Sequence, residues 1–80
     1  MEKTPFLHLK LKEIREKNHL TQKEVASLLG VPRSTYANYE TGNREPEMSV
    51  LIKFASKLNI STEWLFGFSD NPEINREQEK

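Results

Sequence analysis

Hydrophobic residues recur at intervals of three or four along most of the chain, with polar residues between them. This is the period of an α-helix that packs one face into a core. In chain order, the recurring apolar positions are Leu7, Leu11 and Ile14; Val25, Ala26 and Leu29; Tyr36 and Tyr39; and Met48, Leu51, Ile52, Ala55 and Leu58. With a short further segment from Thr62 to Phe66, the pattern predicts an all-α fold of five helices.

The second helix has the clearest boundaries. Thr21 and Glu24 have the spacing of a capping box, in which the threonine hydroxyl accepts from the Glu24 amide and the carboxylate reaches back. The helix should therefore begin at Gln22. Gly30 should end it, because glycine adopts the left-handed backbone conformation without strain.

A third helix follows almost at once, because only Val31 separates Gly30 from Pro32. Proline has a fixed φ angle that suits the first helical position, so we predict a helix from about Pro32 to Glu40. Such a short connection holds two helices in a fixed crossing, as in a helix-turn-helix. The small side chain of Ala26 suits the close approach of these two helices.

A dense apolar group lies near the end of the chain. Ser61 is placed to cap the fifth helix, Gly67 to end it, and Phe68 to fold back as the hydrophobic contact of that C-terminal cap. The group is large for such a short element, so we expect part of it to form a homodimer interface; alternatively, all of it closes the monomer's own core. The candidate interface residues are Trp64, Leu65, Phe66 and Phe68.

The joint spacing of these residues resembles the lambda-repressor-like, Cro-type helix-turn-helix family, also called the XRE family. The resemblance covers about Leu7 to Gly67 and is carried by Thr21-Gln22, Val25-Ala26, Leu29-Gly30-Val31, Arg33-Ser34-Thr35, Tyr39-Glu40, Gly42, Pro46, Leu51-Ile52-Lys53, Ala55, Leu58 and Ile60-Ser61. It implies a compact five-helix lambda-repressor-like DNA-binding domain. Helices 2 and 3 would form the helix-turn-helix, and the helix starting near Pro32 would lie in the DNA major groove.

The chain departs from the family pattern at a few positions. Asn18 and Asn59 stand where the family prefers glycine, and we expect both to adopt the left-handed conformation, which asparagine tolerates well. Pro32 replaces the usual serine or threonine cap, which could shift the start of the third helix.

The resemblance makes the outward face of the third helix the DNA-reading surface. The planar fork of Arg33 matches the O6 and N7 acceptors of guanine, and Asn38 can pair with the N6 and N7 of adenine. The residues expected to contact bases are Arg33, Ser34, Ala37 and Asn38, and those expected to contact phosphates are Gln22, Thr35, Tyr36, Asn43 and Arg44. Core packing is the alternative for Tyr36, and simple solvation is the alternative for Arg33 and Asn38.

The resemblance also implies an ion pair between Arg15 and Glu40, which would tie the first helix to the end of the third. Without it, two solvated charges would be the expectation, because exposed pairs contribute little to stability.

The composition indicates one small domain. The chain has 80 residues and no cysteine, so stability must come from helix packing rather than from disulfides or a thiolate zinc site. Twelve lysines and arginines balance twelve aspartates and glutamates, and a net charge of zero counts against strong non-specific DNA binding. We expect the domain to occupy residues 1–68 and residues 69–80 to be a flexible polar tail or the start of a linker.

Several functional classes have no support in the sequence. His8 and His19 are the only histidines, and neither belongs to a catalytic triad, a metal-binding spacing or a phosphate-binding loop. We therefore expect no enzyme activity, metal, cofactor or small-molecule ligand. No apolar run reaches the ~20 residues of a membrane span, so we expect a cytoplasmic protein with no membrane partner.

The sequence thus favours a sequence-specific transcriptional regulator, a repressor, that binds double-stranded DNA. Two copies related by a two-fold axis would read a palindromic operator with half-sites ~34 Å apart. The alternative is a protein-interaction module, such as an antitoxin that uses the same fold to bind a partner protein.

Overall fold

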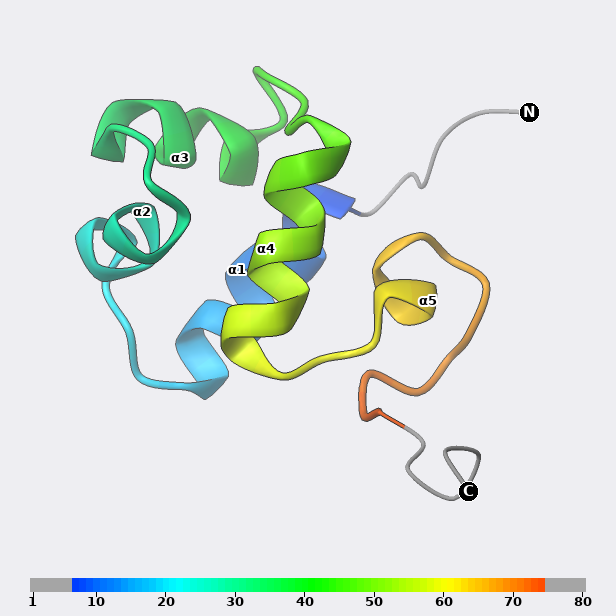
Figure 1. The fold of residues 1–80 in the computed structure, drawn as a ribbon. Helices are drawn as coiled ribbons and strands as arrows, with labels where there is room; N and C mark the ends of the chain where they lie inside the picture. Colours follow the sequence, from blue (N-terminus) through cyan, green and yellow to red (C-terminus); the bar gives the residue numbers. More distant parts are fainter. Residues whose placement is uncertain (1–6, 75–80) are drawn as a thin grey trace.

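Five helices are present in the described part of the chain, residues 7–74, in the computed structural model (Figure 1). They are α1 (Leu7–Lys17), α2 (Gln22–Leu29), α3 (Arg33–Thr41), α4 (Met48–Leu58) and α5 (Thr62–Leu65). Residues 7–74 contain no strand. The predicted all-α class and the five helices are confirmed.

In the view of Figure 1, α4 lies in front of α1 near the middle of the molecule. Helix α3 packs against α1 and α2, and α4 packs against α2 and α5. The α2–α3 pair therefore lies on one flank of α4, and α5 lies on the opposite flank.

All five helices contribute to one core. Its buried apolar residues are Leu11, Ile14, Val25, Ala26, Leu29, Tyr36, Tyr39, Leu51, Phe54, Ala55, Ile60, Trp64 and Leu65. The predicted inner face of α4 was partly wrong, because Met48 and Ile52 are 59% and 52% exposed while Phe54 is fully buried. The face with Met48 and Ile52 and the face with Phe54 both have a helical period. The face with Phe54 packs into the core because it buries the large phenylalanine ring.

The boundaries of α2 agree with the prediction. The Glu24 amide donates to the Thr21 hydroxyl at 3.0 Å, and the Thr21 amide donates to the Glu24 carboxylate at 2.8 Å. Gly30 ends the helix with φ 74°. Both backbone bonds of a C-terminal cap are present, from Gly30 to the Ser27 carbonyl and from Val31 to the Ala26 carbonyl.

Helix α3 starts and ends one residue later than predicted. Pro32 is extended, with ψ 150°, and stands before the helix as a cap without a side-chain hydrogen bond. Its carbonyl accepts the first helical bond, from the Tyr36 amide at 3.0 Å, so the helix begins at Arg33. Helix α3 continues through Thr41, and Gly42 ends it with φ 84°.

The left-handed residue after α1 is His19 (φ 59°), not Asn18 as predicted. The Asn18 side chain donates to the Ile14 carbonyl at 2.8 Å, which keeps Asn18 in the last helical turn. The reversal therefore falls on the next residue. Asn59 is left-handed as expected, with φ 59°.

Helix α5 and its cap differ from the prediction in two ways. The Ser61 hydroxyl accepts from the Trp64 amide as expected, but the helix ends at Leu65 rather than Phe66. Gly67 has the expected left-handed φ of 88°. The Phe68 amide completes the backbone cap by donating to the Glu63 carbonyl, yet the Phe68 ring does not fold back and is 82% exposed.

The segment after Phe68 returns to the start of α5, where the Ser61 amide donates to the Pro72 carbonyl at 2.8 Å. Residues 75–80 of the predicted polar tail lie outside the described residues. A domain boundary at residue 68 stays a prediction.

One buried ion pair links three parts of the fold. Arg15 of α1 donates to the Glu40 carboxylate of α3 through Nε at 2.6 Å and Nη2 at 3.1 Å. Its Nη1 donates to the Leu20 carbonyl, just before α2, at 2.8 Å. The two charged side chains are only 12% and 3% exposed. This pair fixes α1, the α1–α2 connection and α3 relative to one another.

The surroundings of Glu40 favour its charged form. Burial alone would raise the pKa of Glu40, but the hydrogen bonds from Arg15 and Gln22 and the nearby Tyr36 hydroxyl together lower that pKa below the usual value. The hydrogen bond to Glu40 raises the pKa of Arg15. Both groups are therefore held in their ionised forms at neutral pH.

Removing one member of the pair should destabilise the fold. Glu40→Ala leaves the Arg15 guanidinium partly buried without its counter-charge, and we expect a loss on the order of 3 kcal/mol in the free energy of unfolding. Urea unfolding of Glu40→Ala, Arg15→Ala and the double variant measures it. If both single variants are as stable as the wild type, the pair does not stabilise the fold.

The pair should also make stability depend on pH. Because the pKa of Glu40 is lower in the folded than in the unfolded chain, its contribution is present above the unfolded value of about 4.3 and is lost as the pH falls through the folded value. The wild type should lose more stability between about pH 5 and pH 3 than Glu40→Gln, which cannot titrate there. Parallel profiles for the two proteins would contradict this.

Candidate nucleic-acid interface

Helix α3 lies along an edge of the molecule, on the flank opposite α5 (Figure 1). Arg33, Ser34 and Asn38 are exposed, and Thr35 and Ala37 are half-buried. The opposite face of α3 holds Tyr36 and Tyr39 in the core, as predicted. The side chains predicted to read bases therefore share one side of a helix that the core supports from the other.

The Tyr36 hydroxyl does not reach this surface. Tyr36 is fully buried and packs edge to face against Tyr39, with ring centres 6.1 Å apart. Burial and the neighbouring Glu40 carboxylate raise the pKa of Tyr36, and the hydroxyl has no partner at normal hydrogen-bond geometry. The predicted phosphate contact by Tyr36 is therefore wrong, and the alternative of core packing is correct.

Gln22 lies between the ion pair and the surface. Its side-chain amide donates to Glu40 Oε1 at 3.0 Å, and its own Oε1 accepts from Arg33 Nη1 at 3.3 Å. A side-chain amide nitrogen carries two N–H groups and only one of them donates to Glu40, so the donation of this amide to a phosphate stays a prediction. We call the resulting series of hydrogen bonds the Arg15–Glu40–Gln22–Arg33 chain. No local sequence signal indicated it, because its members come from three different helices.

The loop after α3 continues the same edge. The Arg44 amide donates to the Asn38 carbonyl at 3.2 Å, and the Asn43 amide donates to the Thr41 hydroxyl at 3.4 Å. The loop is thus folded onto the end of α3, and the side chains of Asn43 and Arg44 are exposed there. Arg33 and Arg44 mark the two ends of the surface that the sequence predicts to meet DNA.

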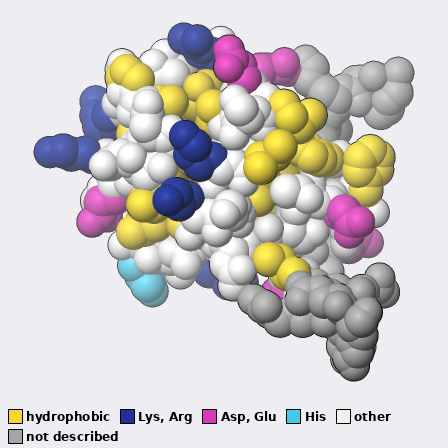
Figure 2. Space-filling model, in the orientation of Figure 1, with side chains coloured by type: hydrophobic (Ala, Val, Ile, Leu, Met, Phe, Trp, Pro, Cys, Tyr) yellow, Lys and Arg dark blue, Asp and Glu magenta, His cyan; other side chains and the backbone are white. Residues whose placement is uncertain are grey.

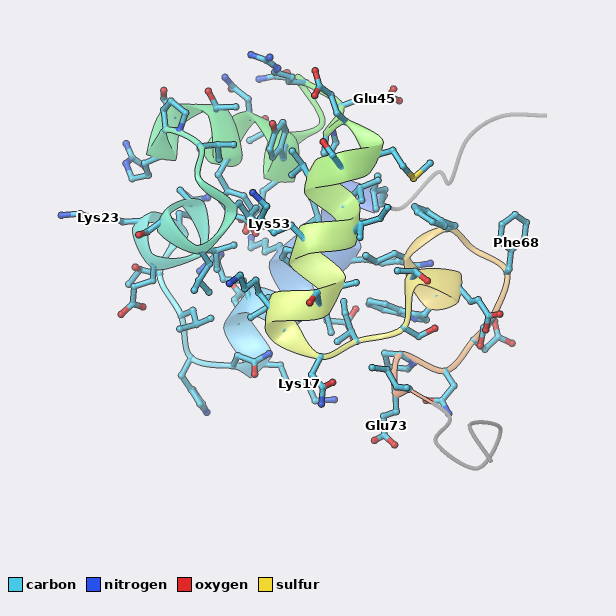
Figure 3. The ribbon with its side chains drawn as sticks, viewed as in Figure 1. Lys17, Lys23, Glu45, Lys53, Phe68 and Glu73 are labelled. Atoms are coloured by element: carbon cyan, nitrogen blue, oxygen red, sulfur yellow. The ribbon has the colours of Figure 1, made fainter. Side chains whose placement is uncertain are left out.

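Charge is distributed unevenly although the total is zero. On the face shown in Figure 2, Lys and Arg gather over α2, α3 and α4, while the α5 side carries Asp and Glu. Lys53 lies at the centre of this face, where its ammonium group is 3.5 Å from the Leu29 carbonyl at the end of α2 (Figure 3). The neutral chain therefore has a basic flank that includes α3.

Other kinds of site find no support in residues 7–74. No group of three or more His, Asp or Glu side chains there is placed to hold a metal ion. No helix in the same range has the length and apolar character to cross a membrane.

Comparison with known families gives one clear match, in which a helix-turn-helix family model covers residues 11–65. The relatives with curated descriptions include the HTH-type transcriptional regulator ImmR of Bacillus subtilis (strain 168), which is 40% identical over 58 residues, 72% of this chain and 46% of ImmR. The uncharacterized HTH-type transcriptional regulator YqaE of the same organism is 34% identical over 70 residues, 88% of this chain and 60% of YqaE.

A shorter relative matches over nearly its whole length. The uncharacterized HTH-type transcriptional regulator MJ0272 of Methanocaldococcus jannaschii is 34% identical over 62 residues, 78% of this chain and 94% of MJ0272. The chain thus spans about half the length of some curated relatives and most of others.

Solved structures show the same architecture. The restriction-modification controller protein C.AhdI from Aeromonas hydrophila is 32% identical, with a TM-score of 0.70 over 75% of this chain and 91% of that one. The P22 c2 repressor, solved with a synthetic operator, has a TM-score of 0.74 over 82% of this chain and 100% of that one. At 20% identity, the second likeness supports the fold alone.

Proposed function

Because the chain belongs to the helix-turn-helix family, we propose that it is a sequence-specific DNA-binding transcriptional regulator that reads the major groove with α3. One observation carries the proposal: Arg33, Ser34 and Asn38 are exposed along α3, and the core supports the helix from behind. A cover over this face, or inward-folded Arg33 and Asn38, would have argued against it. The relatives described as HTH-type transcriptional regulators support the same reading.

The chemistry of α3 suits base recognition. The Arg33 fork matches guanine O6 and N7, Asn38 matches adenine N6 and N7, and the Ala37 methyl group can pack on a thymine methyl group. Ser34 can reach a base or a phosphate. Residues of different chemistry along one helix give sequence preference rather than simple attraction to DNA.

Phosphate contacts would hold the helix in register on both sides. Asn43 and Arg44 are exposed at the far end of α3, and Thr35 is half-buried near its start. At the beginning of α2, the backbone amides of the helix N-terminus and the second side-chain N–H of Gln22 can attract a phosphate. We favour repression, because a small domain bound over a promoter excludes polymerase without any further surface. Such a regulator would act in the cytoplasm, on the chromosome.

We propose a homodimer, in which Phe68 is the part of the predicted apolar group that contacts the second copy. Trp64 and Leu65 are buried in the core and cannot form an interface, whereas Phe68 is 82% exposed. Met48 and Ile52 of α4 are also exposed, and apolar side chains gather between α4 and α5 on the face shown in Figure 2. Phe68 points away from the body of the molecule (Figure 3), which suits contact with a second copy.

Selection of random genomic DNA fragments by the purified protein tests the proposed function. We expect one enriched motif, an approximate palindrome with half-sites ~34 Å apart, because two copies would place their α3 helices about one DNA turn apart. A chain that enriches no motif but captures one protein tightly would be a protein-interaction module instead.

Arg33→Ala and Asn38→Ala should each weaken binding to the selected site by ~1 to 3 kcal/mol and leave thermal stability unchanged, because both side chains are exposed. Fluorescence anisotropy with the selected and a scrambled duplex measures this. Lys57→Ala, which removes an exposed charge from α4, is the matched control. Equal losses on both duplexes would mean that the side chains contact phosphates rather than bases.

Phe68→Ser should raise the dissociation constant of the homodimer by at least about tenfold, since an aromatic ring at a dimer interface buries a large apolar area. Sedimentation equilibrium measures the constant, and circular dichroism should show an unchanged fold. Leu9→Ser alters a half-exposed leucine on α1 and is the control. A dimer that Phe68→Ser leaves intact would place the interface elsewhere.

A further inference from the structure

Lys10 of α1 binds the end of α5, the helix that precedes the proposed dimer contact Phe68. We propose that Lys10 is a positioning residue: it holds the end of α5 in place, sets the direction in which Phe68 projects, and so sets the distance between the two α3 helices of a homodimer. This inference rests on the proposed homodimer. It gives Lys10 a role in the half-site spacing that the regulator accepts.

The Lys10 ammonium group makes two contacts with one residue. Its Nζ donates to the Trp64 backbone carbonyl at 2.5 Å, and it lies over the Trp64 indole ring, 4.9 Å from the ring centre. A cation within about 6 Å of an indole face is attracted to its π electrons. Trp64 is 7% exposed, so both contacts are partly shielded from solvent. Lys10 therefore holds the backbone and the ring of a residue 54 positions away in the sequence.

Helix α5 depends on such contacts because it has only four residues. An isolated helix of this length is unstable in water, so its position must come from packing and from contacts at its ends. At its start, the Ser61 hydroxyl accepts from the Trp64 amide at 3.2 Å, and the Leu65 side chain is fully buried. The carbonyls at the end of a helix attract a cation, and Lys10 supplies one from α1.

The carbonyl that Lys10 binds also closes the turn before Phe68. The Trp64 carbonyl accepts from the Gly67 amide at 3.1 Å, and the Phe68 amide donates to the Glu63 carbonyl at 2.8 Å. The Phe68 backbone is thus bonded to the same last turn of α5, and its ring extends from there away from the molecule (Figure 3). A shift of the Trp64 carbonyl would shift this turn and the ring with it.

Helix α1 also holds the proposed DNA-reading helix. Arg15 lies on the same helix as Lys10 and donates to Glu40 in the last turn of α3. Helix α1 therefore binds α3 through one side chain and α5 through another. In a two-fold dimer joined at Phe68, the separation of the two α3 helices depends on both contacts.

The test measures how strictly the homodimer requires one half-site spacing. It uses a single half-site, the fragment-selected palindrome, and the palindrome with one base pair inserted at its centre, which moves the half-sites about 3.4 Å further apart. The measured quantity is the ratio of affinities for the selected and the inserted palindrome. We expect Lys10→Met to lower this ratio roughly three- to tenfold, the effect of losing one hydrogen bond, and to leave the affinity for the single half-site unchanged.

Three further proteins, each measured well below its melting temperature, make the test specific. Lys10→Arg keeps a cation that can bind both the carbonyl and the ring, so it should keep the wild-type ratio. Lys12→Met is the matched control, because Lys12 is exposed on the same helix and carries the same charge, and it too should leave the ratio unchanged. In the Phe68→Ser background, Lys10→Met should lower the ratio no further, because Lys10 acts through Phe68.

The outcomes separate this role from the proposed function. If Lys10→Met keeps the wild-type ratio, the positioning role is overturned, while the homodimer and its DNA binding stand. An equal loss on the single half-site and on both palindromes would make Lys10 a phosphate contact and would also overturn the role. If the wild type enriches no DNA motif or binds as a monomer, the proposed function or the proposed homodimer fails, and the positioning role fails with it.

Discussion

The buried pair of Arg15 and Glu40 is the interaction on which the rest of the structure depends. A carboxylate that is 3% exposed would be strongly destabilising alone, and it is tolerated because Arg15 donates to both of its oxygens. Arg15 also binds the Leu20 carbonyl, so one guanidinium group connects α1, the entry to α2 and the end of α3. The geometry of the helix-turn-helix relative to α1 follows from a single cluster of hydrogen bonds.

That cluster helps to fix the position of α3 in the fold while one face of the helix stays exposed. Tyr36 and Tyr39 anchor α3 in the core, and Glu40 fixes its C-terminal turn. At the other end, Gly30 turns the chain from α2 directly into α3. A short helix held at both ends and along its inner side can leave most of its outer side exposed.

Local chemistry made the helix boundaries largely predictable. The capping box of Thr21, the left-handed Gly30 and the cap of Ser61 each depend on residues within a few positions of one another. The misses have two causes. The left-handed position falls at His19 because the Asn18 side chain and the backbone amides of Asn18, His19 and Leu20 all donate to the last turn of α1. The inner face of α4 depended on which of two periodic sets could bury the Phe54 ring.

The candidate site was predictable only in outline. Exposure of Arg33 and Asn38 follows from their phase relative to the buried tyrosines, so a pattern could find them. The bond between Gln22 and Glu40 joins residues that are 18 positions apart and depends on the crossing of two helices. The sequence pattern also did not determine whether the Phe68 ring is buried, because the backbone of Phe68 can complete the cap while its ring stays exposed.

The zero net charge affects how much of the DNA-binding free energy phosphate contacts could supply. A strongly basic domain gains most of its affinity from phosphates, which carry no sequence information directly. This chain has no net positive charge, and on the face shown in Figure 2 its Lys and Arg gather over α2, α3 and α4. In the proposed complex, contacts to base edges would then supply a larger share of the binding free energy, and those contacts depend on geometry more than on charge. Arg33, at the start of α3, is connected to the core through its hydrogen bond to Gln22, which donates in turn to the buried Glu40.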